Sequence, residues 1–119
     1  MLGPTGSFAT LESTEVFPGV HRKGFNTEAA TINRYKFAPH ASFPLHSHPQ
    51  EQITLVESGA VEMTISGVVA RLGPGDWSVA EGGSEHGITA SEHGAVFLTV
   101  LTPRRDDPTD YHLADPNES

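Results

Sequence analysis

Short runs of β-branched and aromatic residues recur through most of this sequence, and glycine or proline separates each run from the next. No segment keeps apolar residues at the i, i+3, i+4 and i+7 spacing of a helix over several turns without an intervening glycine or proline. With 12 glycines and 9 prolines among 119 residues, this pattern leaves little room for helices. We therefore expect an all-β fold, a sandwich or a barrel of short strands.

The expected strands are residues 30–37, 53–57, 60–65, 68–72, 77–80 and 95–102. Ser66-Gly67 lies between two of them and predicts a hairpin, and Gly73-Pro74-Gly75-Asp76 predicts a second tight turn. The length allows one domain, residues 1–119. Its core is expected at about 28–103, with an irregular N-terminal segment at 1–27 and an acidic C-terminal tail at 104–119.

Composition excludes several classes of function. Fifteen acidic residues against seven Lys and Arg give a net charge of −8, so neither nucleic acid nor an anionic membrane is an expected partner. The absence of cysteine excludes disulfides, Cys-ligated zinc and thiol nucleophiles. No apolar run approaches the roughly 18 residues of a membrane span. The N-terminus has neither the basic nor the apolar region of a signal peptide, so we expect a cytoplasmic protein.

Histidine is the residue type that points to a function. Among seven histidines, His46 and His48 stand two residues apart, which on a strand places both imidazoles on one face. Gln52 follows four residues after His48, and His86 follows after a hairpin of suitable length. Imidazole nitrogen is a common ligand of transition metals, so this spacing indicates a metal site.

This spacing resembles the two-part signature of the cupins, Gly-x5-His-x-His-x3-Glu-x6-Gly followed by Gly-x5-Pro-x-Gly-x2-His-x3-Asn. The resemblance runs from His40 to Ala90. The matching positions are His46, His48, Gln52 as the Glu/Gln position, Gly59, Gly75, Gly83 and His86. The sequence departs from the pattern at four positions, which carry His40 for Gly, Gln52 for Glu, Glu81 for Pro and Ala90 for Asn.

The resemblance implies a double-stranded β-helix, which is a jelly-roll barrel whose interior can hold a ligand. It also implies one divalent metal ion, Zn, Ni, Mn, Fe or Co, held by His46, His48, Gln52 and His86. Three neutral imidazoles and an amide oxygen leave the ion its full +2 charge, which favours polarisation of a substrate carbonyl or hydroxyl. Two alternatives remain open: Gln52 only forms a hydrogen bond in the barrel, or the histidines are core residues of a cupin without metal.

The remaining histidines are expected outside the site. Ser91-Glu92-His93-Gly94 repeats Ser84-Glu85-His86-Gly87 letter for letter. His93 nevertheless lies seven residues beyond His86, beside Gly94 at an expected turn between two strands, so we expect it to be exposed. His40 stands at the start of a loop and is also expected at the surface. His21 and His112 receive no assignment.

The pocket walls depend on which face of the strand at 30–37 points inward. Arg34 and Lys36 share one face and Tyr35 and Phe37 share the other. An inward basic face would make Arg34 and Lys36 substrate-binding residues for an anion; the alternative is that the aromatic pair fills the core and the basic pair is solvated. Trp77 is a further candidate for substrate binding, with Met63 and Phe97, although ordinary core is the favoured interpretation of each.

The segment after the last expected strand, Thr102 to Asp107, resembles the Pro-Arg-x-Asp segment of the small cupins of pectin and alginate degradation. Those enzymes convert unsaturated monouronates to linear keto sugars, and small polyketide cyclases share the three-His, one-Gln arrangement. The resemblance implies that Asp106 is the catalytic acid near the metal and that Arg104, or Arg105, binds a substrate carboxylate. Asp107 and Pro108 replace the aromatic residue expected after the acid. The alternative is a charged, solvated turn.

We therefore expect a non-redox metal enzyme that catalyses ring opening, isomerisation or cyclisation of a small carbonyl- or hydroxyl-bearing substrate. The alternatives are a metal-dependent dioxygenase and a ligand-binding cupin without activity. Small cupins are commonly dimers, and open sheet edges gain by pairing, so a two-fold homodimer is expected.

Overall fold

The computed structural model describes residues 3–114, and this part of the chain is almost entirely β-structure. It contains one short 3-10 helix, Phe8–Thr10, and nine strands. In chain order the strands are β1 (Thr14–Phe17), β2 (Val20–Asn26), β3 (Thr31–Phe37), β4 (Ser42–Ser47), β5 (Glu51–Ile65), β6 (Val68–Leu72), β7 (Trp77–Ala80), β8 (His86–Thr102) and β9 (His112–Leu113). The all-β prediction is confirmed. No helix in the described part is long and apolar enough to cross a membrane.

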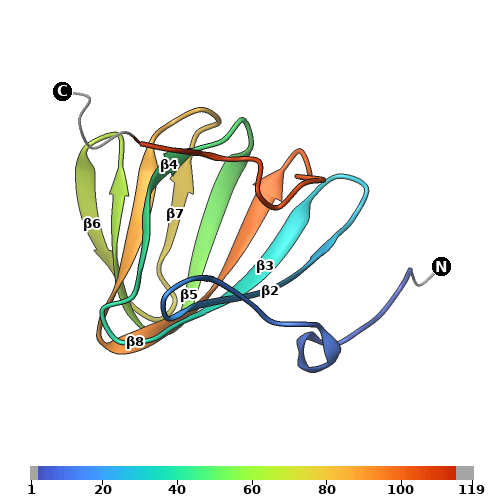
Figure 1. Ribbon diagram of the computed structural model, residues 1–119, viewed down its shortest axis with the longest axis horizontal. Helices are drawn as coiled ribbons and strands as arrows, with labels where there is room; N and C mark the ends of the chain where they lie inside the picture. The colour runs from blue at the N-terminus through green and yellow to red at the C-terminus, as the bar shows by residue number, and fades with distance from the viewer. Residues whose placement is uncertain (1–2, 115–119) are drawn as a thin grey trace.

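One antiparallel sheet curls back on itself to form the barrel (Figure 1). Its path runs β1-β2-β3-β8-β4-β9, while β5 pairs with β6, β7 and β8. The two longest strands, β5 and β8, contribute to both halves. The second half of β8 pairs with β3 and with the first half of β5, and the first half of β8 pairs with β4 and with the second half of β5.

The bend that separates the two halves lies at two glycines. Gly59 in β5 and Gly94 in β8 both have positive φ, 71° and 74°. Gly59 pairs with Ala95, and the register of the β5–β8 ladder shifts on either side of this position. Glycine adopts positive φ without the steric cost that a side chain would add. The strands can therefore turn from one half of the barrel into the other without breaking their pairing.

Strand β3 shows which face points inward. Burial alternates along it, with Thr31, Asn33, Tyr35 and Phe37 buried and the residues between them more exposed. Tyr35 and Phe37 therefore fill the core, and Arg34 and Lys36 lie on the outer face of the sheet. Tyr35 stacks on Phe97, with ring centroids 5.2 Å apart, and Phe37 meets the same ring edge-on at 5.0 Å. This aromatic cluster forms the centre of the hydrophobic core.

The structure contains strands that the sequence does not predict. β1 and β2 lie within the expected irregular segment at 1–27, and β2 pairs with β3 along its whole length. The sequence of β2 is mostly polar and therefore lacks the alternation of apolar and polar residues from which a strand is predicted. β4 carries Pro44, which argues against a strand in sequence reasoning. At His93–Gly94 the expected turn is instead the bend within β8.

Candidate metal centre

Three histidines from two different strands meet inside the barrel. His46 lies near the end of β4, His48 just after that strand, and His86 begins β8, where it pairs with His46. Each is almost fully buried, with 5%, 2% and 1% exposure respectively. One ring nitrogen from each histidine can be chosen so that all three lie within 4.8 Å of one another. This grouping can hold a metal ion.

A backbone carbonyl fixes the orientation of each ring. Nδ1 of His46 lies 2.8 Å from the oxygen of Pro44, Nδ1 of His48 lies 3.0 Å from that of Gln50, and Nδ1 of His86 lies 3.0 Å from that of Ser84. A carbonyl oxygen can only accept, so each Nδ1 carries the proton and donates it. In a neutral ring this leaves a lone pair on Nε2, which is the atom available to a metal.

Burial keeps these rings neutral. Desolvation is the largest cause in all three and lowers the pKa of His46 to about 3. It also lowers the pKa values of His48 and His86. The positive charge of Arg105 acts in the same direction on each histidine. The rings are therefore uncharged at neutral pH, as imidazole ligands of a metal must be.

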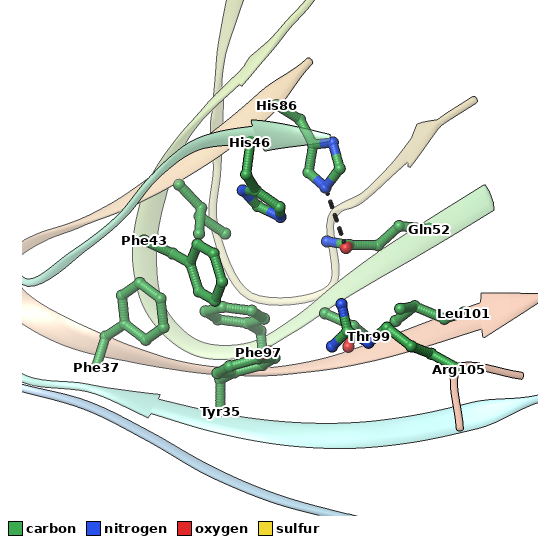
Figure 2. A pocket seen from close by; sticks show the side chains of 11 residues that line it. Tyr35, Phe37, Phe43, His46, Gln52, His86, Phe97, Thr99, Leu101 and Arg105 are labelled. Atoms are coloured by element: carbon green, nitrogen blue, oxygen red, sulfur yellow. Dashed lines mark hydrogen bonds between the residues drawn. The ribbon is translucent and has the colours of Figure 1, made fainter. Parts of the chain in front are cut away.

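Gln52, near the start of β5, points its amide oxygen at the same place (Figure 2). Its Oε1 lies 3.1 Å from Nε2 of His48 and 3.2 Å from Nε2 of His86. Its Nε2 donates to the hydroxyl of Thr54 at 3.1 Å, which fixes the orientation of the amide. Lone pairs on Oε1 and both Nε2 atoms thus face each other with no proton between them. A bound cation satisfies such a set, so the residues fit a divalent ion with nitrogen and oxygen ligands.

The cavity beside these ligands is small, about 20 Å³. That is room for about one water molecule or one ion. Aromatic side chains gather on one side of it in Figure 2, and Thr99, Leu101 and Arg105 lie on another. Its apolar lining residues are Phe37, Phe43, Ile88, Phe97 and Leu101. No carboxylate is among the described residues that line it.

Arg105 is the residue of this pocket that sequence analysis named only as an alternative to Arg104. It is 6% exposed and lines the cavity with His46, Gln52 and His86. Its backbone N–H donates to the hydroxyl of Thr31 at 2.8 Å, which attaches the segment after β8 to β3. Burial lowers its pKa, and the neighbouring Tyr35 acts in the opposite direction. Arg104 and Arg105 lie in an irregular segment after β8, so no strand periodicity indicates from the sequence which of the two points inward.

The other residues selected from the sequence lie outside this cavity. Arg34 pairs with Glu57 at 3.1 Å on the outer face of the sheet, and Lys36 is exposed on the same face because β3 turns its aromatic side inward. Trp77 is 65% exposed.

In the segment after β8, the side chain of Asp106 is 76% exposed, and its carboxylate lies 2.8 Å from Nε of the exposed Arg104. The side chain of His93 is 82% exposed, and His40 is exposed.

The sequence and the structure of this chain are similar to those of several known proteins. The pectin degradation protein KdgF of Dickeya dadantii (strain 3937) is 33% identical over 72 residues, which are 60% of this chain and 66%, just under two thirds, of the relative. The structure of KdgF from Halomonas sp. is 35% identical, with a TM-score of 0.78 over 87% of this chain and 98% of that one. An RmlC-like cupin from Shewanella frigidimarina NCIMB 400, 20% identical, has a TM-score of 0.80 over 86% and 92% of the two chains and shares the fold.

Residues 33–102 match the sequence model of the family described as "Cupin domain". The matched range contains His46, His48, Gln52 and His86, together with most of the barrel strands. The chain belongs to the cupin family.

Proposed function

We propose that this protein is a metal-dependent, non-redox enzyme that opens the ring of a small unsaturated uronate and isomerises it to the linear keto form. The observation that carries the proposal is the buried Arg105, which has no carboxylate partner among residues 3–114 and lines the same cavity as His46, Gln52 and His86. Such a cation fits the carboxylate of a uronate. The relatives named KdgF, one of them described as a pectin degradation protein, support the same substrate class.

The reaction needs no oxidant. The anomeric hydroxyl loses its proton and becomes an aldehyde, while the bond between the anomeric carbon and the ring oxygen breaks. The electron pair of that bond passes to the ring oxygen, which leaves an enolate at the former double bond. A proton then adds to the far carbon of this double bond, and the ring oxygen becomes that of a ketone. Atoms and electrons balance within the sugar, so the overall change is an isomerisation.

The pocket supplies groups for each part of this change. When bound at His46, His48, His86 and Gln52, a divalent ion supplies positive charge that polarises a substrate oxygen. Arg105 holds the carboxylate. Tyr35 is the phenol of the cavity, and we assign to its hydroxyl the movement of the proton. The metal cavity admits only about one water molecule or ion, so we place only the reacting oxygen of the sugar there, beside apolar walls such as Phe43. The resemblance implies this role for Asp106, but we propose Tyr35 instead, because the side chain of Asp106 is 76% exposed and does not line the cavity.

Turnover of an unsaturated monouronate by the metal-loaded protein tests the proposal, with the linear product followed by NMR. Tyr35→Phe is expected to retain metal and lower kcat by roughly 10²- to 10⁴-fold, while Asp106→Asn changes kcat little. Arg105→Met is expected to raise KM, whereas the exposed Arg104→Met serves as its matched control.

Absence of any product from several uronates would overturn the proposal. Oxygen consumption that matches substrate loss would move the protein to the dioxygenase class instead. A large loss of kcat in Asp106→Asn with normal activity in Tyr35→Phe would return the proton-moving role to Asp106.

We also propose that the protein is a homodimer formed through the outer face of the sheet. Apolar side chains lie next to one another there on β3, β8, β5 and β7. They are Ile32, Leu98, Val100, Ile53, Leu55, Trp77 and Val79. Trp77 is then an interface residue, which accounts for a large apolar side chain held at the surface.

A further inference from the structure

A second cavity shares Arg105 with the metal cavity, and none of the three metal-site histidines lines it. Its volume is about 270 Å³, and Arg105 lines both this space and the metal cavity. Its remaining walls come mainly from β2 and β3, including Arg22, Asn33 and Thr31. The cavity is much larger than the space beside the metal ligands, and it borders that space through a single arginine.

Three side chains that line this cavity each carry a buried nitrogen donor without a partner within the described residues. The donors are NH1 of Arg22, Nδ2 of Asn33 and Nε of Arg105. Asn33 is 4% exposed and Arg105 is 6% exposed, so bulk water does not reach these side chains freely. A buried donor without an acceptor costs roughly 1–3 kcal/mol, and more when it is charged. The arrangement therefore favours a ligand that brings several acceptor atoms.

The charges at this cavity select the kind of ligand. Among residues 3–114, no carboxylate forms an ion pair with Arg22 or Arg105, although Glu12 borders the cavity. The positive charge of Arg22 contributes to the lowered pKa of Arg105, after the larger effect of burial. Two guanidinium groups that repel each other are both stabilised by one anion placed between them.

The backbone holds Asn33 in place for this role. Gly24 of β2 pairs with Asn33 of β3, and a Cβ at Gly24 would overlap the Oδ1 of Asn33. The missing side chain lets the amide lie across β2. Arg22 lies two residues earlier on the same strand and pairs with Tyr35, so both residues of β2 lie on the inner face. The donors are thus presented from two paired strands and from the segment after β8.

We infer that Arg22, Asn33 and Arg105 form a carboxylate-binding subsite that holds the acid group of the substrate, with Arg105 shared between this subsite and the metal cavity. The identity of the ligand as a uronate rests on the proposed function. A carboxylate offers two oxygens, and the guanidinium forks with the amide offer matching donors. Arg22 and Asn33 are then specificity-determining residues that the cupin signature does not contain.

Binding of a saturated uronate to the metal-loaded protein tests this subsite without requiring turnover. By calorimetry, D-galacturonate is expected to bind, while D-galactose, which lacks the carboxylate, binds far more weakly. Arg22→Met is expected to weaken galacturonate binding by at least about tenfold, whereas Arg34→Met, on the outer face of the sheet, leaves it unchanged. Asn33→Asp keeps the side-chain volume but places a negative charge in the cavity, and it is expected to abolish binding.

Folding is checked in each variant by thermal unfolding, and Gly24→Ala provides a variant that removes no donor. It is expected to weaken galacturonate binding by displacing the amide of Asn33. Equal binding of galacturonate and galactose, or binding unchanged in both Arg22→Met and Asn33→Asp, would overturn the subsite. Binding that depends on Arg22 without turnover of any unsaturated uronate would overturn the proposed function alone. Turnover with an unchanged KM in Arg22→Met would overturn the subsite alone.

Discussion

At the scale of single residues, a hydrogen bond to a nearby backbone carbonyl fixes the orientation of each metal-site imidazole. The carbonyl that fixes His46 comes from Pro44, two residues before it, and the one that fixes His48 comes from Gln50, two residues after it. His86 is held in the same way by Ser84. The tautomer of each imidazole is therefore set by a carbonyl only two residues away along the chain. Tertiary packing has only to bring three prepared Nε2 atoms together.

Removal of any one of these imidazoles is expected to abolish stoichiometric metal binding. His48→Ala deletes a buried nitrogen ligand and leaves a cavity that cannot supply another, so metal content after purification falls well below one equivalent. The matched control is His93→Ala, because His93 has the same preceding residues, Ser-Glu, as His86 but is exposed. Elemental analysis gives the result. One full equivalent of metal in His48→Ala would contradict the site.

At the scale of elements, the two glycines of the bend let β5 and β8 serve both halves of the barrel. A Cβ at Gly59 would overlap the carbonyl oxygen of Gly94 and lie 2.8 Å from Cα of Ala95. The backbone of the two strands is thus in direct contact at the bend. This close approach brings the start of β8, with His86, and the start of β5, with Gln52, to the same cavity.

Gly59→Ala is expected to destabilise the fold more than a glycine substitution at an exposed turn. Gly67 in the β5–β6 hairpin also has positive φ, 81°, but a Cβ there has open space. Gly67→Ala therefore carries only the conformational cost, roughly 1–2 kcal/mol. Gly59→Ala adds a clash with backbone atoms and is expected to cost at least roughly twice as much. Urea unfolding measures both. Equal losses of unfolding free energy would show that the bend relaxes around the methyl group.

These elements differ in how far the sequence predicts them. Alternating or β-branched runs in the sequence predict β3, β6 and β7. The cupin signature alone groups His46, His48 and His86 in one site, without any knowledge of strand pairing. β2 could not be predicted, because its stability comes from pairing with β3 rather than from its own apolar face. The sequence also gives no sign that Arg22 and Arg105 line the same cavity. They are 83 positions apart, and only the strand pairing of the folded chain brings them together.

At the scale of the whole molecule, the barrel separates two kinds of surface. The inner face carries the aromatic core, the imidazoles and the buried arginine. The outer face of β3, β8, β5 and β7 carries side chains that a monomer would leave in water, including Leu55 at 38% and Trp77 at 65% exposure. Apolar surface of this kind is stabilised by contact with a second apolar surface.

Trp77→Arg is expected to convert a homodimer into a monomer while leaving the metal centre intact. A charged side chain at the proposed interface is buried against the apolar surface of the other protomer, once in each protomer, so the dimer carries two buried unpaired charges. The matched control is Val68→Arg, since Val68 is 70% exposed on the β5–β6 hairpin, away from this face. Light scattering at micromolar concentration gives the mass. We expect a dimer for the wild type and for Val68→Arg, and a monomer with full metal content for Trp77→Arg. A wild-type mass near 12.7 kDa would rule out the dimer, since it equals that of a single chain.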